Sequence, residues 1–211
     1  MTDLYTQAEV DMDRAAVREV VENWVLYRDA GDWDRFAAVW HPDGWMSTTY
    51  FQGPSEEFIE VCKVGCRAGS HILHLLGAHT CDLVDDRAVA QTKVQILQRG
   101  TFDGVTVDVT CTGRFYDFLA RRDGRWALVR RQTIYEKDRM DPVVPGVRLL
   151  LDQALLDKFP EGYRYLAYLQ EKLGYHVHPD LPGREGPAIL QVYRDGIAWL
   201  DGSQFPGNMY E

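Results

Sequence analysis

The segment SHILHLLGAHT, residues 70–80, places His71, His74 and His79 in a run that otherwise has the composition of a buried β-strand. Histidine exchanges a proton near neutral pH and is also a common metal ligand. The segment could therefore provide a metal centre, a catalytic base or only a packed core. A metal site needs three or four convergent ligands, and strand alternation places His71 and His74 on opposite faces. We therefore expect no metal.

The remaining candidate metal ligands do not strengthen that reading. His176 and His178 lie in a Pro/Gly-rich tail, where we expect a surface position. The four cysteines match neither a disulfide framework nor a zinc knuckle. They are Cys62 and Cys66, one helical turn apart, and Cys81 and Cys111, in apolar strand-like runs. We expect them to be reduced and structural.

Composition excludes several classes of protein. The chain has 211 residues, 45% of them hydrophobic, which is enough for one sizeable core or a domain with an extension. The net charge of -9 has acidic and basic residues mixed along the chain, so no basic stripe is available to bind nucleic acid. The N-terminus lacks the features of a signal peptide, and no apolar run is long enough to span a membrane. We expect a soluble, cytoplasmic protein.

Three helices are predicted before residue 69. Apolar residues recur at helical spacing from Arg14 and stop at Gly31, which ends the first helix, and Asp32 can cap a short second one. Pro54 opens a third helix through about Cys66, with glutamates in its first turn, where the helix dipole favours them.

After these helices, the periodicity changes to that of strands. Four long strand candidates cover residues 71–84, 87–102, 105–122 and 125–136. They are divided by Asp85-Asp86, Asp103-Gly104 and Asp123-Gly124, and Asp-Gly is a strong hairpin signal. The sequence therefore predicts an α+β domain over residues 1–140, in which a curled antiparallel meander follows three helices.

The composition changes again beyond residue 140. Residues 141–211 contain two predicted helices, divided at Phe159-Pro160, then the Pro/Gly-rich tail and a possible last strand, AILQVY, at residues 188–193. This C-terminal helical extension has no core of its own. We expect it to pack on the first domain or on a neighbouring subunit.

Two-residue hairpin turns would fix the register of the meander. Counting outward from the turns predicts these facing pairs: Arg131 with Tyr116, Thr133 with Arg114, Tyr135 with Thr112, Thr110 with Leu97, and Leu97 with His74. One face is then mixed in character and contains His74, Leu76, Ala78, Gln95, Leu97, Asp108, Thr110, Thr112, Arg114, Tyr116, Arg131, Thr133 and Tyr135. The other face is apolar and contains Val94, Ile96, Val105, Val107, Val109, Cys111 and Phe115, with His71 and His79.

Two interpretations of these faces are open. In the first, the apolar face is the core and the mixed face meets water, as is usual for antiparallel sheets. In the second, the sheet curls into a cone whose mixed face lines a pocket under the first helix, while the apolar face packs on another subunit.

The order of helix, short helix, VWHPDGW, helix and long meander with RRDGRW in its last hairpin resembles the SnoaL-like branch of the nuclear transport factor 2-like superfamily. The resemblance covers about residues 14–140 and implies a cone fold with a pocket. Within the branch, the chain is most similar to hexachlorocyclohexane dehydrochlorinases, and more distantly to bile-acid 7α-dehydratases and scytalone dehydratases. These are eliminating enzymes that use no cofactor, so the resemblance implies that none is needed here.

The resemblance also implies a site. Asp29 in YRDAGDWDRFAAVW matches the aspartate that orients a catalytic histidine, and that histidine matches His74. Arg131 matches an arginine on the last strand. The lysine or tyrosine that relatives carry on the first helix falls at Trp24, which leaves the substrate and the leaving group open. Without the resemblance, Asp29 would be a helix-terminal residue in water. The substrate-binding candidates are Trp24, Tyr27, Trp45, Tyr50, Leu97, Thr110, Thr112, Arg114, Tyr116 and Tyr135.

The implied function is a cofactor-independent lyase with an Asp-His base that eliminates water, or formaldehyde with water, from a small aromatic or cyclic substrate. In length and in its added C-terminal structure, the chain also resembles γ-formaldehyde lyases that act on lignin-derived diaryl propanediols. The alternatives are a non-catalytic small-molecule-binding protein and an isomerase with the same pocket. We expect a homo-oligomer, a dimer or trimer, formed through the outer face of the sheet.

Overall fold

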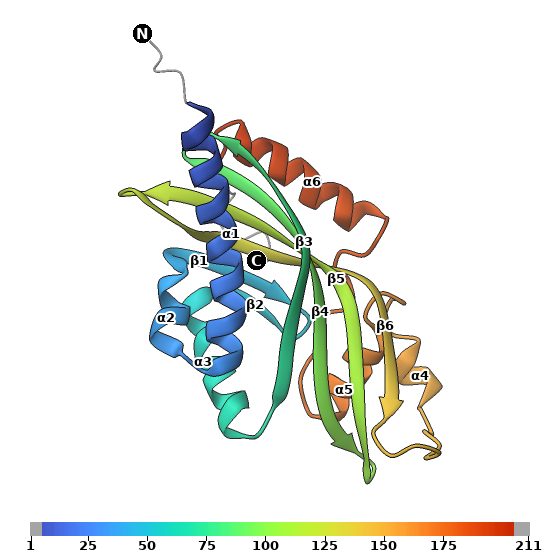
Figure 1. The fold of residues 1–211 in the computed structure, drawn as a ribbon. Coiled ribbons are helices and arrows are strands. Elements are labelled where there is room, and N and C mark those ends of the chain that lie inside the picture. The colour runs from blue at the N-terminus through green and yellow to red at the C-terminus, as the bar shows by residue number, and fades with distance from the viewer. Residues whose placement is uncertain (1–5, 205–211) are drawn as a thin grey trace.

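The computed structural model describes residues 6–204, which form a mixed α+β fold around one curled, unclosed sheet (Figure 1). The six strands of this region lie in the order β2-β1-β6-β5-β4-β3. Their bounds are β1 (Trp40–Thr48), β2 (Phe51–Pro54), β3 (His71–Val84), β4 (Arg87–Phe102), β5 (Val105–Arg122) and β6 (Arg125–Pro142). The predicted antiparallel meander is confirmed over β3 to β6, whereas the parallel pairing of β1 with β6 is an addition to it.

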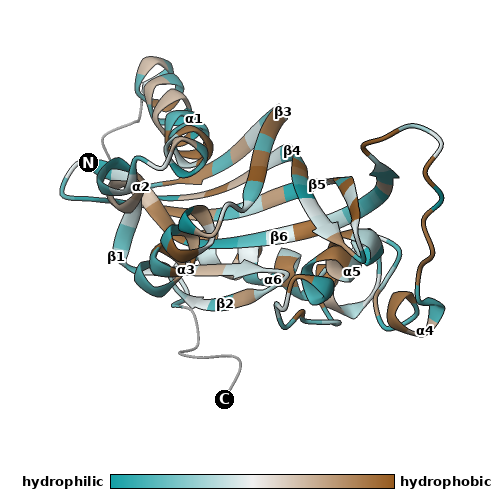
Figure 2. Ribbon diagram, turned by 90° about the horizontal axis from the view of Figure 1, so that it is seen from below, coloured by the Kyte–Doolittle hydropathy of each residue, from teal (hydrophilic) through white to brown (hydrophobic). Residues whose placement is uncertain are grey.

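The helices predicted before the meander lie over the concave face of the sheet (Figure 2). They are α1 (Gln7–Ala30), α2 (Trp33–Ala38) and α3 (Ser55–Arg67). α1 stops where the sequence predicts, because Gly31 adopts a φ of 71°, which glycine reaches without steric cost. The Asp32 side chain then accepts a hydrogen bond from Arg35 N and caps α2.

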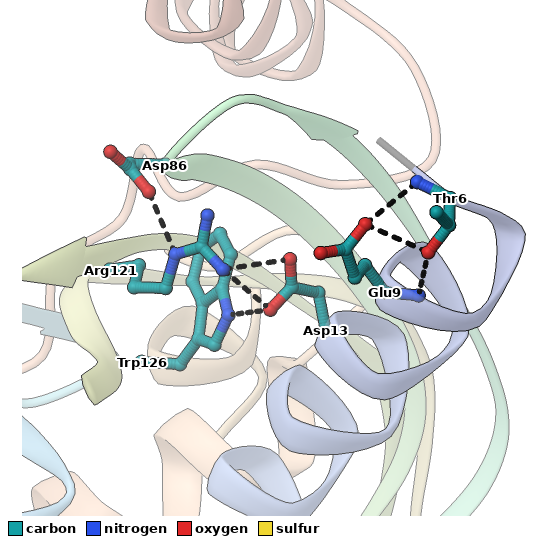
Figure 3. A network of polar contacts seen from close by, with 6 residues as sticks. All are labelled: Thr6, Glu9, Asp13, Asp86, Arg121 and Trp126. Atoms are coloured by element: carbon teal, nitrogen blue, oxygen red, sulfur yellow. Dashed lines mark hydrogen bonds and ion pairs between the residues drawn. The ribbon is translucent and has the colours of Figure 1, made fainter. Parts of the chain in front are cut away.

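The first half of α1 is fixed to the β5–β6 hairpin (Figure 3). The helix begins with a capping box between Thr6 and Glu9. One turn later, the buried Asp13 carboxylate accepts from Trp126 Nε1 at 2.8 Å and from Arg121 Nη1 at 3.1 Å. These bonds set the direction in which α1 crosses the sheet.

Two β-bulges in β6 change the predicted register. Leu119 faces Leu128 but Phe118 faces Arg130, so Val129 is an extra residue, and Glu136 is extra between the pairs Gly113–Tyr135 and Thr112–Lys137. Because of the bulge at Val129, Arg131 faces Asp117, Thr133 faces Phe115 and Tyr135 faces Gly113, instead of Tyr116, Arg114 and Thr112. Gly113 is needed at the second bulge because a Cβ there would overlap the carbonyl oxygen of Ile134.

A third bulge lies in β3, where two residues, Gly77 and Ala78, stand opposite Lys93 alone. His74 therefore faces Ile96 and not Leu97. A one-residue slip moves every later side chain to the other face. His74, Arg131, Thr133 and Tyr135 thus join the concave face, and the predicted composition of the two faces is wrong for these residues.

The concave face is the main core of the described residues, beneath α1 and α3. The prediction that the apolar face packs on another subunit is therefore wrong, because Ile96, Val107, Val109, Cys111 and Phe115 are buried against the helices of the same chain. Figure 2 shows hydrophobic and hydrophilic residues alternating along β3 to β5, as expected for strands whose two faces differ.

The C-terminal extension covers both faces of the sheet. β6 continues through the predicted boundary at residue 140 to Pro142 and is followed by α4 (Gln153–Leu156), α5 (Arg164–Lys172) and α6 (Pro187–Leu200). α5 packs on the concave face through Leu166 and Leu169. α6 packs on the convex face, where Trp199 meets Phe118 (Figure 1).

The predicted last strand, residues 188–193, is wrong because this segment belongs to α6. The helix starts with Pro187 at its first position, and its buried residues, Ile189, Val192, Gly196 and Trp199, recur at three- and four-residue spacing. Gly196 lets the helix approach the sheet closely, since a Cβ there would overlap the Tyr116 hydroxyl.

Candidate functional site

Asp29 and His74 form a pair at the junction of α1 and β3. Asp29 Oδ1 lies 2.9 Å from His74 Nδ1, and Oδ2 accepts from the backbone N–H of His74 at 2.6 Å. Because both carboxylate oxygens hold the same residue, the ring is fixed in position and Nδ1 carries its proton. The Nε2 atom is then left as the basic nitrogen, and it has no hydrogen-bond partner among the described residues.

The surroundings keep this pair in the form that a base requires. The His74 side chain is 7% exposed, and burial lowers its pKa, assisted by the positive charges of Arg28 and Arg131. Burial alone would raise the pKa of Asp29, but its hydrogen bonds with His74 and the charge of Arg28 outweigh burial and lower it. At neutral pH, the site therefore holds an ionised carboxylate beside a neutral imidazole.

Arg28 ties the last turn of α1 to β3. Its Nη1 donates to Asp29 Oδ1 at 3.0 Å and to the carbonyl oxygen of Ile72 at 2.7 Å. The side chain is only 12% exposed, yet the neighbouring acidic groups keep its pKa raised and its charge in place. Sequence analysis did not identify Arg28, although it immediately precedes Asp29.

The pair borders a cavity that is enclosed by helices from both ends of the chain. Its wall consists of Trp24, Arg28, Met46, Thr48, Thr49, Tyr50, Phe58, Ile72, His74, Ile96, Phe115, Thr133, Leu166 and Gln170. The His74 ring packs edge-on to Trp24, with ring centroids 5.4 Å apart. The free space is about 20 Å³, which is room for about one water molecule. A ring-sized ligand must therefore displace part of the wall.

A second cavity of about 50 Å³ adjoins the first between α1, α3 and the segment after α5. Arg28, Tyr50 and Ile72 line both cavities, while Asp29, Cys66 and Tyr175 line only the second. The rings of Tyr50 and Tyr175 lie 5.0 Å apart at this junction. Tyr50 therefore stands at the junction of the two cavities, beside Tyr175.

Arg131 lies behind the aromatic wall of the first cavity. It is completely buried in a two-point ion pair with Asp117, with both N–O distances at 2.7 Å. Its guanidinium carbon lies 4.3 Å from the centre of the Trp24 ring and 3.9 Å from that of Phe115. Arg131 thus shares the concave face with His74, but its side chain is not part of the cavity wall. The bulges that create the pair with Asp117 leave no signal in the sequence.

The other predicted binding residues divide between the cavity and the rest of the molecule. Trp24 and Tyr50 line the cavity, and Tyr135 is buried close by, with its hydroxyl 3.2 Å from Thr48 Oγ1. The remaining candidates lie outside the cavity wall: Tyr27 beside Arg35, Trp45 opposite Pro54, and Leu97, Thr110, Thr112, Arg114 and Tyr116 on the convex face. The last five residues lie on the face predicted for them, but the bulges place His74 and Arg131 on the opposite face.

Residues 6–204 contain no cluster of three or more His, Cys, Asp or Glu side chains that could hold a metal ion. His71 and His74 lie on opposite faces as predicted, but His79 shares the concave face with His74, because of the bulge between them. His79 Nδ1 is 2.8 Å from Thr92 Oγ1. Within the same residues, no helix is long and apolar enough to cross a membrane.

The family is shown by comparison with known proteins. Residues 12–132 match the SnoaL-like domain, so the chain belongs to the SnoaL-like family, and the resemblance derived from its sequence is confirmed. An uncharacterized protein of Emericella nidulans is 36% identical over 92% of this chain and 88% of its own. Pea pathogenicity protein 2 of Fusarium vanettenii is 33% identical over the same shares. The chain therefore spans most of the length of these relatives.

Solved structures share the fold at low sequence identity. A hexachlorocyclohexane dehydrochlorinase of type 2 superposes with a TM-score of 0.55 and 14% identity, covering 70% of this chain and 99% of its own. A protein of Novosphingobium aromaticivorans assigned as a scytalone dehydratase superposes with a TM-score of 0.51 and 19% identity, covering 72% of this chain and 97% of its own. These two neighbours leave more than a quarter of this chain unmatched. The SnoaL-like match ends at residue 132, before the C-terminal extension, whose Leu166 and Gln170 line the cavity.

Proposed function

We propose that this protein is a cofactor-independent lyase in which Asp29 and His74 act together as a general base on a small aromatic or cyclic substrate. The observation that carries the proposal is the pair of hydrogen bonds that Asp29 accepts from the backbone N–H and from Nδ1 of His74. These bonds leave Nε2 as the free basic nitrogen beside a cavity. Similarity to structures named as a dehydrochlorinase and a scytalone dehydratase adds support for elimination as the reaction class.

In the proposed reaction, His74 Nε2 takes a proton from a substrate carbon. The C–H electron pair forms a double bond, and the bond from the adjacent carbon to its oxygen breaks. The departing hydroxide receives the proton back from the imidazolium and leaves as water, so the reaction needs no external oxidant or reductant. Asp29 stabilises the imidazolium that forms between these steps. Such a base contributes about 10²- to 10⁴-fold in rate.

Negative charge that develops on the leaving oxygen requires a partner. Arg28 is a cationic side chain in the cavity wall and lies beside Tyr50, which places both in reach of a bound substrate. Arg131 acts on the same charge from behind Trp24 and Phe115, through its field and not through contact. In this proposal, Arg28 contacts the leaving group directly and Arg131 does not.

The test is a turnover assay of His74→Asn with His79→Asn as its matched control. Both histidines lie on the concave side of β3, but His79 pairs with Thr92 and does not line the cavity. A panel of hydroxylated cyclic and phenolic compounds is screened, with water or halide loss and formaldehyde release followed separately. We expect His74→Asn to lose activity and His79→Asn to keep it.

Each other outcome selects a different function. Full activity in His74→Asn overturns the proposed base. A product of unchanged composition identifies an isomerase, and binding without product from any compound identifies a binding protein. Release of formaldehyde from a diaryl propanediol assigns the narrower lyase reaction, which requires a larger displacement of the cavity wall than a single ring does.

A further inference from the structure

The buried amide of Gln170 joins the C-terminal extension to the wall of the cavity. Gln170 lies on α5 and is 2% exposed, and its Nε2 donates to Oε1 of Gln98 on β4 at 3.0 Å. Gln98 is 1% exposed. The two amides therefore connect α5 to the sheet inside the core.

This amide pair leaves hydrogen-bonding capacity unused. Gln170 Oε1 and Gln98 Nε2 are buried and have no hydrogen-bond partner. Trp24 Nε1 and Thr133 Oγ1 are also buried without a partner, and like Gln170 these residues line the cavity with His74. Polar groups that are buried unpaired cost free energy, and several of them around one cavity indicate a ligand that pairs with them.

The chemistry of these groups narrows the class of ligand. Rotating both glutamine amides together exchanges acceptor and donor at Gln170, so a ligand group that can both donate and accept pairs with Gln170 in either arrangement. A hydroxyl group has both properties, and its oxygen can also accept from Trp24 Nε1 or Thr133. The rest of the wall is apolar and aromatic, including Phe58, Ile96 and Phe115, and suits a hydrocarbon ring.

We propose that Gln170 is a specificity-determining residue that binds a hydroxyl group on the ring of the substrate, with Gln98 holding the amide in position. The inference rests on the proposed function only in taking the His74 cavity as the substrate site. It names hydroxylated ring compounds as the substrate class. It also gives the C-terminal extension, which lies outside the matched SnoaL-like region, a part in recognition.

The test compares the binding of phenol and toluene, which place a hydroxyl or a methyl group of similar size on the same ring. Dissociation constants are measured by NMR titration for the wild type, Gln170→Met and Gln170→Glu. The control is Lys172→Met on the same helix, where Lys172 pairs with Asp103 and does not line the cavity. If Gln170→Met does not fold, Gln170→Asn, which withdraws the amide by one methylene, replaces it.

We expect the wild type and Lys172→Met to prefer phenol over toluene by about tenfold or more, the size of one buried hydrogen bond. Gln170→Met should lose most of this preference and bind toluene within about twofold of the wild type. Gln170→Glu should keep the preference, because its carboxylate still accepts from the ligand while Gln98 Nε2 donates to it.

Three results would overturn the inference. They are an unchanged preference for phenol in Gln170→Met, an equal loss of affinity for both compounds in that variant, and no binding of either compound to the wild type. The amide pair would then serve only to join α5 to β4. Failure of the proposed function is measured separately, because full turnover by His74→Asn would overturn the base and leave the phenol preference of Gln170 intact.

Discussion

The two ends of α1 are attached to the sheet by carboxylates, the buried Asp13 and the partly buried Asp29, yet only one attachment is equipped for chemistry. At the first end, Asp13 accepts from Arg121 and from Trp126, neither of which can give up its proton near neutral pH (Figure 3). At the second end, Asp29 holds His74 by its ring and by its backbone. Only a histidine keeps a second, basic nitrogen when its first is engaged.

The same residue type thus serves as a helix anchor at Asp13 and, in the proposed function, as the group that orients a catalytic histidine at Asp29. What differs is the partner and the space beside it. A groove between α1 and the β5–β6 hairpin is lined by Trp126 but not by Asp13. Asp29, in contrast, lines one cavity, and His74 lines the cavity that adjoins it.

The largest expected effect comes from exchanging each carboxylate for its amide. Asp29→Asn should lower kcat/KM by about 10²- to 10⁴-fold, because an asparagine no longer fixes the proton on Nδ1 of His74. Asp13→Asn should keep the activity and lose about 1 kcal/mol or more of stability. Turnover and chemical denaturation of both variants give the comparison, and equal activity of the two would refute the distinct role of Asp29.

A large loss of stability is expected for Arg131→Met, because Asp117 would then be an unpaired buried charge. Breaking one partner of such a pair costs about 3–5 kcal/mol, whereas replacing both by apolar residues is often nearly neutral. The double variant Arg131→Met/Asp117→Leu should therefore regain a stable fold. If Arg131 acts on the leaving group, this variant keeps its affinity for substrate but has a lower kcat. Unchanged kcat in the folded double variant would assign Arg131 a structural role alone.

A change of pH should affect the Asp29 end of α1 through His74. Burial lowers the pKa of His74, so the neutral base persists below the ordinary value of 6.5 and kcat/KM should stay level from about pH 7 to 8. The folded state binds this proton less readily than the unfolded chain, so the stability that His74 contributes is present above pH 6.5 and is lost as the pH falls below it. Measurements of kcat/KM and of unfolding across pH check the two expectations. A fall in activity with decreasing pH that is centred above pH 7 would contradict the lowered pKa of His74.

A third carboxylate, Asp138, should have a smaller effect on stability, and its pH dependence should be opposite to that of His74. Asp138 Oδ2 accepts from the backbone N–H groups of Tyr165 and Leu166 at the start of α5, and burial raises the pKa of Asp138 to about 6. Its stabilising contribution is therefore present below pH 4 and is lost as the pH rises through 6. Asp138→Asn keeps an acceptor without the charge, so it should raise Tm by about 2–4 °C at pH 8 and leave Tm unchanged below pH 4. A lower Tm at pH 8 would show that the charge is needed.

No effect is expected from metal removal. Exhaustive chelation should leave both activity and Tm unchanged, because His71 lies on the other face of β3 from His74, and His79 is paired with Thr92. Elemental analysis gives the independent measurement. Stoichiometric zinc that is lost together with activity would restore these histidines as candidate ligands.

The homo-oligomer predicted from the outer sheet face stays a prediction, and α6 limits where it can form. This helix covers part of the convex face over β4 and β5, and it leaves Leu73 and Leu75 on β3 about half exposed. The convex side of β3 is therefore the part of the outer face that is available to a second copy.

Local sequence correctly predicted the features that depend on a few neighbouring residues. Gly31 ends α1, and the Asp-Gly pairs form two-residue turns because Asp103, Asp123 and the glycines after them adopt positive φ. The family resemblance paired Asp29 with His74, and the two residues are in contact in the structure. Face assignment failed because a single bulge reverses it. Glycines accompany two of the bulges, Gly77 in β3 and Gly113 opposite Tyr135, but no glycine or proline marks the bulge at Val129 that shifts Arg131.

The sequence by itself determined the α+β class, the meander and the end of α1, and its family resemblance pointed to Asp29 and His74 as a pair. The tertiary structure decided which residues surround that pair: it buried Arg131 against Asp117, put Arg28 in the cavity wall, made a helix of residues 187–200 and brought Gln170 to His74 from the far end of the chain. The reason is physical. Turns and caps depend on a few neighbouring residues, whereas the shape of a cavity depends on how segments distant in the sequence pack against one curled sheet.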